Sequence, residues 1–422
     1  MKVVTVHRGA RDQYQVACAL HEAGLLESLV TDLYWPADER RAKAVARAFP
    51  ARVRQNLLNR NAELLPGRAV RSCWASGGLA LTCDVVPFLP FWLKRASMRF
   101  CDRQLGKRAA KIANRRNAAL LSYSYYAHSA FAHFHHDQPR ILFQLHPHPA
   151  SVRSILERER GLHPECAGSL EKEWELALPE RDFQSLVQEC GLSDYWITAS
   201  SFTKNTLIEH GAPAERIQVM PYGTDLNRFT PGNTRHPVKR PLRLLFVGTV
   251  CQRKGIKYLV DALESLPLGT AELTICGRLV DDAAILRNTR TPIHLCAFVS
   301  AEKLLREFQS SDVFVFPSLA EGFGHVLLEA MACGLPVIST TRTAAPDLIS
   351  DGREGFITEP GDTGALANCL EYFLKNPDQV SRMGSAARVR AEAFTWQKFR
   401  QRVAEAVSKM IHSKEPAASA FR

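Results

Sequence analysis

Apolar runs and amphipathic segments alternate along the second half of the chain. The run Arg243–Val247 is apolar after its first residue and ends in Gly248, a pattern typical of a strand buried on both faces. After it, the pattern predicts strands at 272–276, 293–298, 313–316, 335–339 and 355–357, and helices at 255–266, 301–309 and 325–333. This alternation predicts a doubly wound α/β sheet of parallel strands.

The first half shows the same two patterns with less regularity. A strand is expected at Val3–Val6, followed by a helix from about Gln13 to Ala23. A later strand near residue 196 leads into a helix that Ser200 or Ser201 caps, because a serine hydroxyl accepts a hydrogen bond from the free amides at a helix start.

The length of the chain predicts two domains. A chain of 422 residues is too long for one core, and two domains of about 200 residues each are expected. The predicted boundaries are 1–229 for the first domain, 230–241 for a linker rich in proline and charge, and 242–394 for the second domain. Residues 395–422 are expected to form a C-terminal helix and a frayed tail.

Composition indicates a globular protein of a reducing compartment. Hydrophobic residues make up 46% of the chain, which supports packed cores, yet no run of 18 apolar residues exists to span a membrane. The N-terminus leads directly into a strand, without a signal-peptide pattern. The 11 cysteines are scattered and contain no Cys-x-x-Cys pair, so we expect free thiols and a cytoplasmic protein.

Two glutamates eight positions apart form the most informative motif. Glu321 precedes a Gly-Phe-Gly turn, and Glu329 lies inside the helix that begins near His325. The strand before the turn and the strand after the helix complete a βαβ unit, with both acids at its carboxyl edge, where open α/β sheets bind ligands. Free amides at the helix start suit a diphosphate, and a carboxylate one turn further in can accept hydrogen bonds from a ribose diol. The alternative is a pair of surface glutamates beside an ordinary helix start.

The run from Glu321 to Ile338, EGFGHVLLEAMACGLPVI, resembles the Glu-x7-Glu motif of retaining glycosyltransferases of family four. Pro-Tyr-Gly-Thr-Asp at 221–225 resembles the end of the first domain in that family, and the likeness extends from about 195 to 394. The resemblance implies a GT-B fold, in which two Rossmann-like domains face a cleft and the last helix crosses back to the first domain. It also implies that Glu329 holds the donor ribose and that Glu321 contacts the transferred sugar.

A second pair of residues is expected to hold the donor diphosphate. Lys254 and Arg253 lie in the turn after strand 243–247, at the same sheet edge as the two glutamates. Cations there would stabilise the charge that develops on a departing diphosphate; the alternative is two solvated loop cations. The family has an arginine where this chain has Thr249, so Arg253 is the expected substitute. The turn residues Phe323 and Gly324 and the first helical residue, His325, are also expected to bind the donor.

Two further candidates come from the first domain. The family has a glycine-rich loop after the first strand, and here Gly9 alone represents it. The apolar strand Ile141–Leu145 ends in His146-Pro-His148, and the resemblance implies a histidine close to the donor sugar and the acceptor, with His146 as the candidate and His148 as the alternate. The other interpretation is that prolines hold both histidines in a turn.

The positive charge is concentrated at the start of the chain. Residues 1–118 carry 21 Lys and Arg against 9 Asp and Glu, and this region accounts for the whole-chain net charge of +11. Within it, residues 85–100 mix aromatic and cationic side chains, which suits contact with an anionic membrane surface. The alternative is a core segment with solvated arginines, and no nucleic-acid-binding signature accompanies the charge.

Together these patterns predict an enzyme that moves a sugar from a UDP- or GDP-sugar to a glycan, lipid-linked or small-molecule acceptor with retention of configuration. Polysaccharide or glycoconjugate biosynthesis is the expected context. No Asp-x-Asp metal motif occurs, so neither a metal nor another cofactor is expected. A nucleotide-sugar epimerase on the same fold and a non-catalytic scaffold at the membrane are the alternatives.

Overall fold

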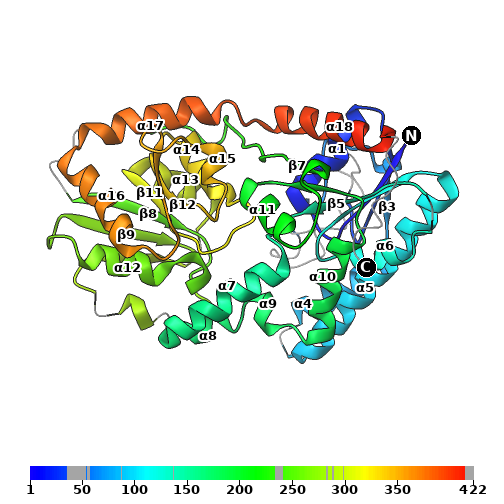
Figure 1. Ribbon diagram of the computed structural model, residues 1–422, viewed down its shortest axis with the longest axis horizontal. Helices are drawn as coiled ribbons and strands as arrows, with labels where there is room; N and C mark the ends of the chain where they lie inside the picture. The colour runs from blue at the N-terminus through cyan, green and yellow to red at the C-terminus, as the bar shows by residue number, and fades with distance from the viewer. Residues whose placement is uncertain are drawn as a thin grey trace.

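The computed structural model describes residues 1–35, 54, 58–86, 88–135, 137–232, 241–281, 284–287, 289–297 and 299–413. Two domains lie side by side, each built around a sheet of parallel strands (Figure 1). The predicted linker at 230–241 lies mostly outside the described residues. No helix among the described residues is long and apolar enough to cross a membrane.

The first domain contains a seven-stranded sheet with the order β3-β2-β1-β4-β5-β6-β7. The central strands consist largely of buried residues, as expected where helices cover both faces of a parallel sheet, while the edge strands β3 and β7 are partly exposed. The strands are β1 Val3–Val6, β2 Leu26–Thr31, β3 Val70–Ser72, β4 Ala119–Tyr123, β5 Arg140–Gln144, β6 Tyr195–Thr198 and β7 Ile217–Val219.

The second domain contains a six-stranded sheet with the order β10-β9-β8-β11-β12-β13. All of its neighbouring strands are parallel, and the predicted alternation of strands and helices is confirmed. Position 298 of one predicted strand lies outside the described residues. The strands are β8 Leu242–Val247, β9 Ala271–Cys276, β10 Ile293–Cys296, β11 Val313–Phe316, β12 Val337–Thr340 and β13 Gly355–Thr358.

Helices connect the strands in both domains. Those of the first domain are α1 Gln15–Glu22, α4 Trp74–Val85, α5 Phe91–Arg116, α6 Ala127–Ala132, α7 Pro149–Leu162, α8 Ala167–Leu170, α9 Trp174–Ala177, α10 Glu180–Gly191 and α11 Ser201–Glu209. Those that follow are α12 Ile256–Glu264, α13 Ala301–Ser310, α14 His325–Ala332, α15 Ala345–Leu348, α16 Thr363–Lys375, α17 Asp378–Ala391 and α18 Trp396–His412.

The start of α1 differs from the expectation of a helix from about Gln13. The residues Asp12, Gln13 and Tyr14 have φ values of 42°, 54° and 62°, in the left-handed region, and the helix begins only at Gln15. Left-handed residues cannot continue a right-handed helix. None of the three is a glycine, so the sequence carried no sign of this conformation.

The order of strands reverses at one point in each sheet. In the first sheet β1 lies between β2 and β4, and in the second sheet β8 lies between β9 and β11. At such a reversal the connections leave on opposite faces and open a crevice at the carboxyl ends of the strands. The loops after β1 and β4, and those after β8 and β11, are therefore the places where each domain can bind a ligand.

Helix α18 joins the C-terminal end of the chain to the first domain. Helices α17 and α18 run along one edge of the molecule across both domains, and α18 reaches α1 (Figure 1). The Arg400 guanidinium donates hydrogen bonds to Glu22 Oε2 at 2.8 Å and to Gln15 Oε1 at 2.9 Å, both on α1. Buried Phe399 and Val403 add apolar contacts to this packing.

The domains also meet where the loop after β11 touches the end of β5. Ser200, which caps α11 as expected, donates a hydrogen bond from Oγ to the Gly322 carbonyl oxygen at 2.6 Å. A Cβ atom on Gly322 would lie 1.8 Å from the Leu145 carbonyl oxygen and 3.1 Å from the His146 Cα. Only glycine permits this approach of one backbone to the other.

We predict that Gly322→Ala destabilises the protein by about 1–3 kcal/mol, because the methyl group would overlap backbone atoms of the other domain. The free energy of unfolding from urea denaturation measures the effect. Gly161→Ala on α7 is the matched control, since its Cβ would meet nothing within 4 Å and alanine favours a helix. Equal stability of the two variants would contradict the close contact.

Candidate active site between the two domains

Three of the predicted site residues lie together at the reversal point of the second sheet. Arg253 and Lys254 belong to the short 3-10 turn Gln252–Lys254 after β8, and Glu321 follows β11. Because β8 and β11 are neighbours, their loops lie side by side. The Lys254 ammonium contacts Glu321 Oε2, and Arg253 Nη1 lies 3.4 Å from the same oxygen.

The two cations of this cluster are largely withdrawn from solvent. Lys254 is 9% exposed, and its ammonium lies 4.9 Å from the centre of the Phe316 ring. Burial and the neighbouring Arg253 charge lower the pKa of Lys254 to about 7, while the nearby Glu173 carboxylate acts in the opposite direction. A second anion at this position would meet both cations at close range.

Arg253 connects the two domains. Its Nε donates a hydrogen bond to Glu173 Oε2 at 2.8 Å, and its Nη1 donates to the Ala320 carbonyl oxygen at 2.9 Å. Glu173 lies just before α9, in the first domain. The guanidinium is thus held between an acid of the first domain and the motif loop of the second.

Helix α14 begins at His325, as predicted. Its N-cap, Gly324, has a φ of 81° and offers no side chain to the first amides. His325 is exposed and stacks on the Tyr222 ring at 4.5 Å. Phe323 is 3% exposed and meets the same ring edge-on at 5.2 Å. Phe323 therefore packs the turn, and the α14 amides and the His325 ring are the parts that a ligand can reach.

Glu329 lies one turn into α14. It is half-buried, and its side chain accepts no hydrogen bond from the described residues. Burial raises the pKa of its carboxyl from 4.5 to about 7, and the nearby Arg228 charge opposes this shift. A half-buried carboxyl without a donor partner can accept hydrogen bonds from a ligand hydroxyl.

His146 lies at the end of β5, against the motif loop. Burial, then the charges of Arg253, Arg11 and Lys254, lower the pKa of its imidazole to about 3. The ring is therefore neutral at physiological pH, and it can donate or accept a hydrogen bond but cannot act as an imidazolium acid. The edge of the Tyr125 ring packs against it at 5.3 Å.

Two other candidates lie away from this cluster. His148 is buried, caps α7 by accepting a hydrogen bond from the Ala150 amide at 3.3 Å, and stacks on His210 at 3.8 Å. Gly9 has a φ of 76° and donates its amide to Asp32 Oδ1 at 2.9 Å. Gly9 lines a separate cavity of about 310 Å³, and the ion cluster of Arg253, Lys254 and Glu321 does not line it.

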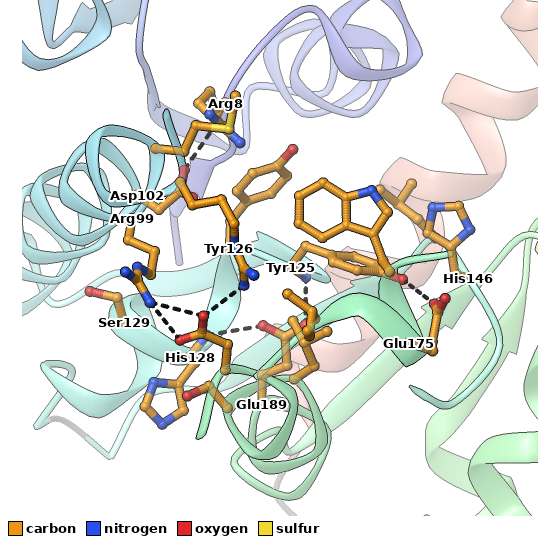
Figure 2. Close-up of a pocket in the computed structure, with 18 of the residues that line it drawn as sticks. Arg8, Arg99, Asp102, Tyr125, Tyr126, His128, Ser129, His146, Glu175 and Glu189 are labelled. Carbon is orange, nitrogen blue, oxygen red and sulfur yellow. Dashed lines mark hydrogen bonds and ion pairs between the residues drawn. The ribbon is translucent and has the colours of Figure 1, made fainter. Parts of the chain in front are cut away.

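A larger cavity of about 790 Å³ extends from His146 and Arg253 into the first domain (Figure 2). Its walls come from the loops after β1 and β4 and from helices α5, α9 and α10. Arginines are its most frequent charged residues, and they are Arg8, Arg11, Arg95, Arg99, Arg103, Arg181 and Arg253.

A buried carboxylate fixes the wall that follows β4. Glu189 accepts hydrogen bonds from the amides of Tyr125, Ala127 and His128 at 2.5, 3.1 and 3.2 Å (Figure 2). Burial raises the pKa of the Glu189 carboxyl to about 8, against the effect of these three donors. Tyr125 itself has a φ of 75° and donates its hydroxyl to Glu175 at 2.7 Å. The cavity wall is therefore rigidly held.

The sequence interpretation missed the residues that the first domain contributes. Arg11, Tyr125, Tyr126, Glu173 and Trp174 all line the large cavity, and none was a candidate. Arg8 and Arg11 had a detectable signal, because two arginines follow the first predicted strand at its carboxyl end. Glu173 and Trp174 had none, since they come from an irregular segment between helices.

Comparison with known proteins finds similarity that includes the second domain. Residues 233–390 match the family model described as glycosyl transferases group 1. A D-inositol 3-phosphate glycosyltransferase of Paenarthrobacter aurescens is 35% identical over 46% of this chain and 52% of its own length. The amylovoran biosynthesis glycosyltransferase AmsK of Erwinia amylovora is 31% identical over 46% of this chain and 50% of its length. These matches span about half the length of each relative.

Solved structures agree with the fold over nearly the whole chain. Sucrose-phosphate synthase from Thermosynechococcus elongatus has a TM-score of 0.65 at 17% identity and covers 97% of this chain and 99% of its own. Anabaena Alr3699/HepE in complex with UDP-glucose has a TM-score of 0.59 at 16% identity and covers 97% and 100%. The predicted GT-B fold of two Rossmann-like domains is confirmed.

We predict that Glu329→Gln changes the pH dependence of stability. The folded pKa of Glu329 lies above its ordinary value of 4.5, so its contribution to stability is present below pH 4.5 and is lost as the pH rises through 7. The glutamine cannot ionise. The Tm of the variant relative to the unaltered protein should therefore rise between pH 5 and pH 8, with exposed Glu157→Gln as the control. Parallel Tm profiles for Glu329→Gln and the unaltered protein would contradict this.

Proposed function

We propose that this chain, whose residues 233–390 match the model of the group 1 glycosyltransferases, transfers a sugar from a UDP- or GDP-sugar to an acceptor with retention of configuration. The observation that carries the proposal is the contact of Lys254 and Arg253 with Glu321, at the reversal point of the second sheet and beside His146. This arrangement combines cations for a diphosphate with a carboxylate and a neutral imidazole for a sugar.

The donor would lie along the loops of the second domain. Its diphosphate would meet Lys254, Arg253 and the amides at the start of α14, where the helix dipole adds positive potential. The ribose diol would donate hydrogen bonds to Glu329, which is half-buried one turn further in. A structural relative, HepE, has been solved in complex with UDP-glucose, which supports a nucleotide sugar as the donor.

The transferred sugar would lie between Glu321 and His146. Glu321 belongs to the ion cluster, and His146 lies against the loop that carries it. His146 is neutral, so it would hydrogen-bond a sugar hydroxyl. In a front-face displacement, the acceptor oxygen bonds to the anomeric carbon on the side from which the diphosphate leaves. The bond from that carbon to the phosphate oxygen breaks, and the departing phosphate takes the acceptor proton.

Glu321 would compete with the donor for the cations. Its carboxylate contacts both Lys254 and Arg253, so an arriving diphosphate must share or displace that contact. Once displaced, the carboxylate is free to orient the sugar. Because two fixed cations would balance the departing diphosphate, we propose that the transfer requires no metal ion.

The epimerase alternative makes a different product from the same donor. An epimerase returns an isomerised nucleotide sugar, whereas a transferase releases the free nucleoside diphosphate with a glycosylated product. The half-buried Glu329 and the clustered cations also argue against a non-catalytic scaffold, since a scaffold has no need to hold charges in a cleft.

A thermal-shift screen with UDP-, GDP- and ADP-sugars tests the donor assignment, because a ligand of the folded state raises its Tm. We predict that one of them stabilises the protein, and that Glu329→Ala and Lys254→Ala each weaken its binding roughly 10- to 100-fold through a lost charge-assisted contact. Turnover, measured as free nucleoside diphosphate released in EDTA, should fall in both variants. Unchanged kinetics in both would refute the assignment.

We also propose that the first domain contacts an anionic membrane surface. Phe88 is 93% exposed and Trp92 is 67% exposed, at the connection between α4 and α5. Arg99 lies seven positions after Trp92, and Arg103 lies four positions after Arg99, so all three share one helix face. An exposed aromatic pair beside arginines suits the interface of an anionic bilayer, and the same two arginines line the large cavity.

The membrane contact predicts that the double variant Phe88→Ser, Trp92→Ser loses sedimentation with vesicles of phosphatidylglycerol, while its Tm stays unchanged because both side chains are exposed. Binding should also weaken in high salt and with neutral phosphatidylcholine vesicles. Val389→Ser on α17 removes another side chain, 68% exposed, and serves as the control. Equal sedimentation of the double variant and the control would exclude this surface.

A further inference from the structure

Two arginines project from the loop after β1 toward the same tyrosine. The guanidinium carbons of Arg8 and Arg11 lie 5.7 and 5.5 Å from the centre of the Tyr126 ring. The Tyr126 hydroxyl also accepts hydrogen bonds from Arg11 Nε at 3.2 Å and Nη2 at 2.5 Å. Both arginines line the large cavity and the smaller one beside it.

Among the described residues, one of the two arginines has a carboxylate in ion-pair contact and the other has none. Arg8 Nε lies 3.1 Å from Asp102 Oδ1, but the contact lacks hydrogen-bonding geometry. Burial raises the pKa of the Asp102 carboxyl to about 7, so this acid is a weak partner. Arg11 has no carboxylate partner among the residues that the structure describes. A guanidinium in this position favours an anionic ligand.

The conformation of the loop holds Arg11 in place. The three left-handed residues Asp12, Gln13 and Tyr14 follow it directly, and strained backbone of this kind concentrates at functional sites. Asp12 accepts hydrogen bonds from the Tyr123 hydroxyl at 2.7 Å and from the Val16 amide at 3.3 Å, which ties the loop to β4 and α1. Arg11 is therefore positioned before any ligand arrives.

An aromatic wall lies on another side of the cavity. Trp174 is 53% exposed, and its ring meets Tyr125 edge-on at 6.3 Å. Tyr125 in turn packs against His146, at the end nearest the ion cluster of the second domain. Figure 2 shows Tyr125, Glu175 and His146 together, with Arg8, Asp102 and Tyr126 on a separate part of the wall. Aromatic faces with a few fixed polar groups are typical of a site for a small polar ligand.

We propose that the acceptor is a sugar that bears a phosphate group, and that Arg11, supported by Arg8, binds this phosphate. The planar guanidinium would donate parallel hydrogen bonds to two phosphate oxygens. Trp174 and Tyr125 would bound the sugar ring, with the reacting hydroxyl directed to His146 and the donor. The inference rests on the proposed function and assigns the acceptor class for the same site.

Inorganic phosphate is the first probe, with its affinity taken from the rise in Tm across a concentration series. Arg11→Gln is expected to weaken phosphate binding in the large cavity about tenfold or more, and Lys254→Gln should retain that binding, because Lys254 belongs to the donor loops. Arg382→Gln on α17 removes the same charge far from the cavity and should behave as the unaltered protein. Phosphate stabilisation of Arg11→Gln equal to that of the unaltered protein would overturn the proposal.

Tyr126→Phe gives a second measurement if Arg11→Gln fails to fold. It removes only the hydroxyl that holds Arg11, and a severalfold loss of phosphate affinity is expected. The donor screen separates this proposal from the proposed function. A nucleotide sugar should still stabilise Arg11→Gln. If no nucleotide sugar stabilises the unaltered protein, the donor assignment alone is refuted.

Two competitors distinguish the sources of the phosphate. If glucose 6-phosphate displaces inorganic phosphate more strongly than glucose does, the ligand is a free sugar phosphate. If vesicles of phosphatidylinositol displace inorganic phosphate and phosphatidylcholine vesicles do not, the phosphate is held at a lipid surface. Displacement by neither, at concentrations where phosphate itself binds, would contradict the assignment of a sugar phosphate to this cavity.

Discussion

The close approach of Gly322 to the end of β5 is the contact on which the site depends. Parallel strands present their carboxyl ends at one edge of a sheet, and each sheet of this protein has a reversal point at that edge. The absence of a side chain at Gly322 lets the loop after β11 rest on Leu145 and His146. The two reversal points then face a common space, which neither domain forms alone.

Charge is distributed unequally across this space. The second domain supplies Lys254 and Arg253 with Glu321 between them, and the first domain supplies a larger group of arginines. Glu173 reaches from the first domain to Arg253 and links the two sets. The proposed donor and acceptor anions would each find cations from the nearer domain, while His146 stays neutral between them.

The second domain was largely predictable because its signals are local. The motif from Glu321 to Glu329 follows strand β11 and contains a turn and a helix start, so its residues are near in sequence and near in space. Arg253 and Lys254 could be added because β8 and β11 are adjacent in a doubly wound sheet. The roles of these residues toward a donor stay predictions.

The first-domain site was not predictable in the same way. The position of Arg11 depends on three left-handed residues, none of which is glycine. Tyr125 also has a positive φ, and its amide donates a hydrogen bond to Glu189. Glu189 lies 64 positions away in the chain, and Glu173 meets Arg253 across 80 positions. Gly9 followed a family pattern, yet its amide is bonded to Asp32 and lies outside the large cavity.

The sequence by itself determined the parallel sheets, the start of α14 and the grouping of Arg253 and Lys254 with Glu321. These features follow from hydrophobic periodicity and from turn chemistry, which act over a few residues. Only the tertiary structure decided that Arg11 lacks a carboxylate partner among the described residues. It also decided that His148 is buried as a helix cap and that His146 faces the cleft. Those outcomes depend on burial and on partners from distant segments, and local sequence carries no record of either.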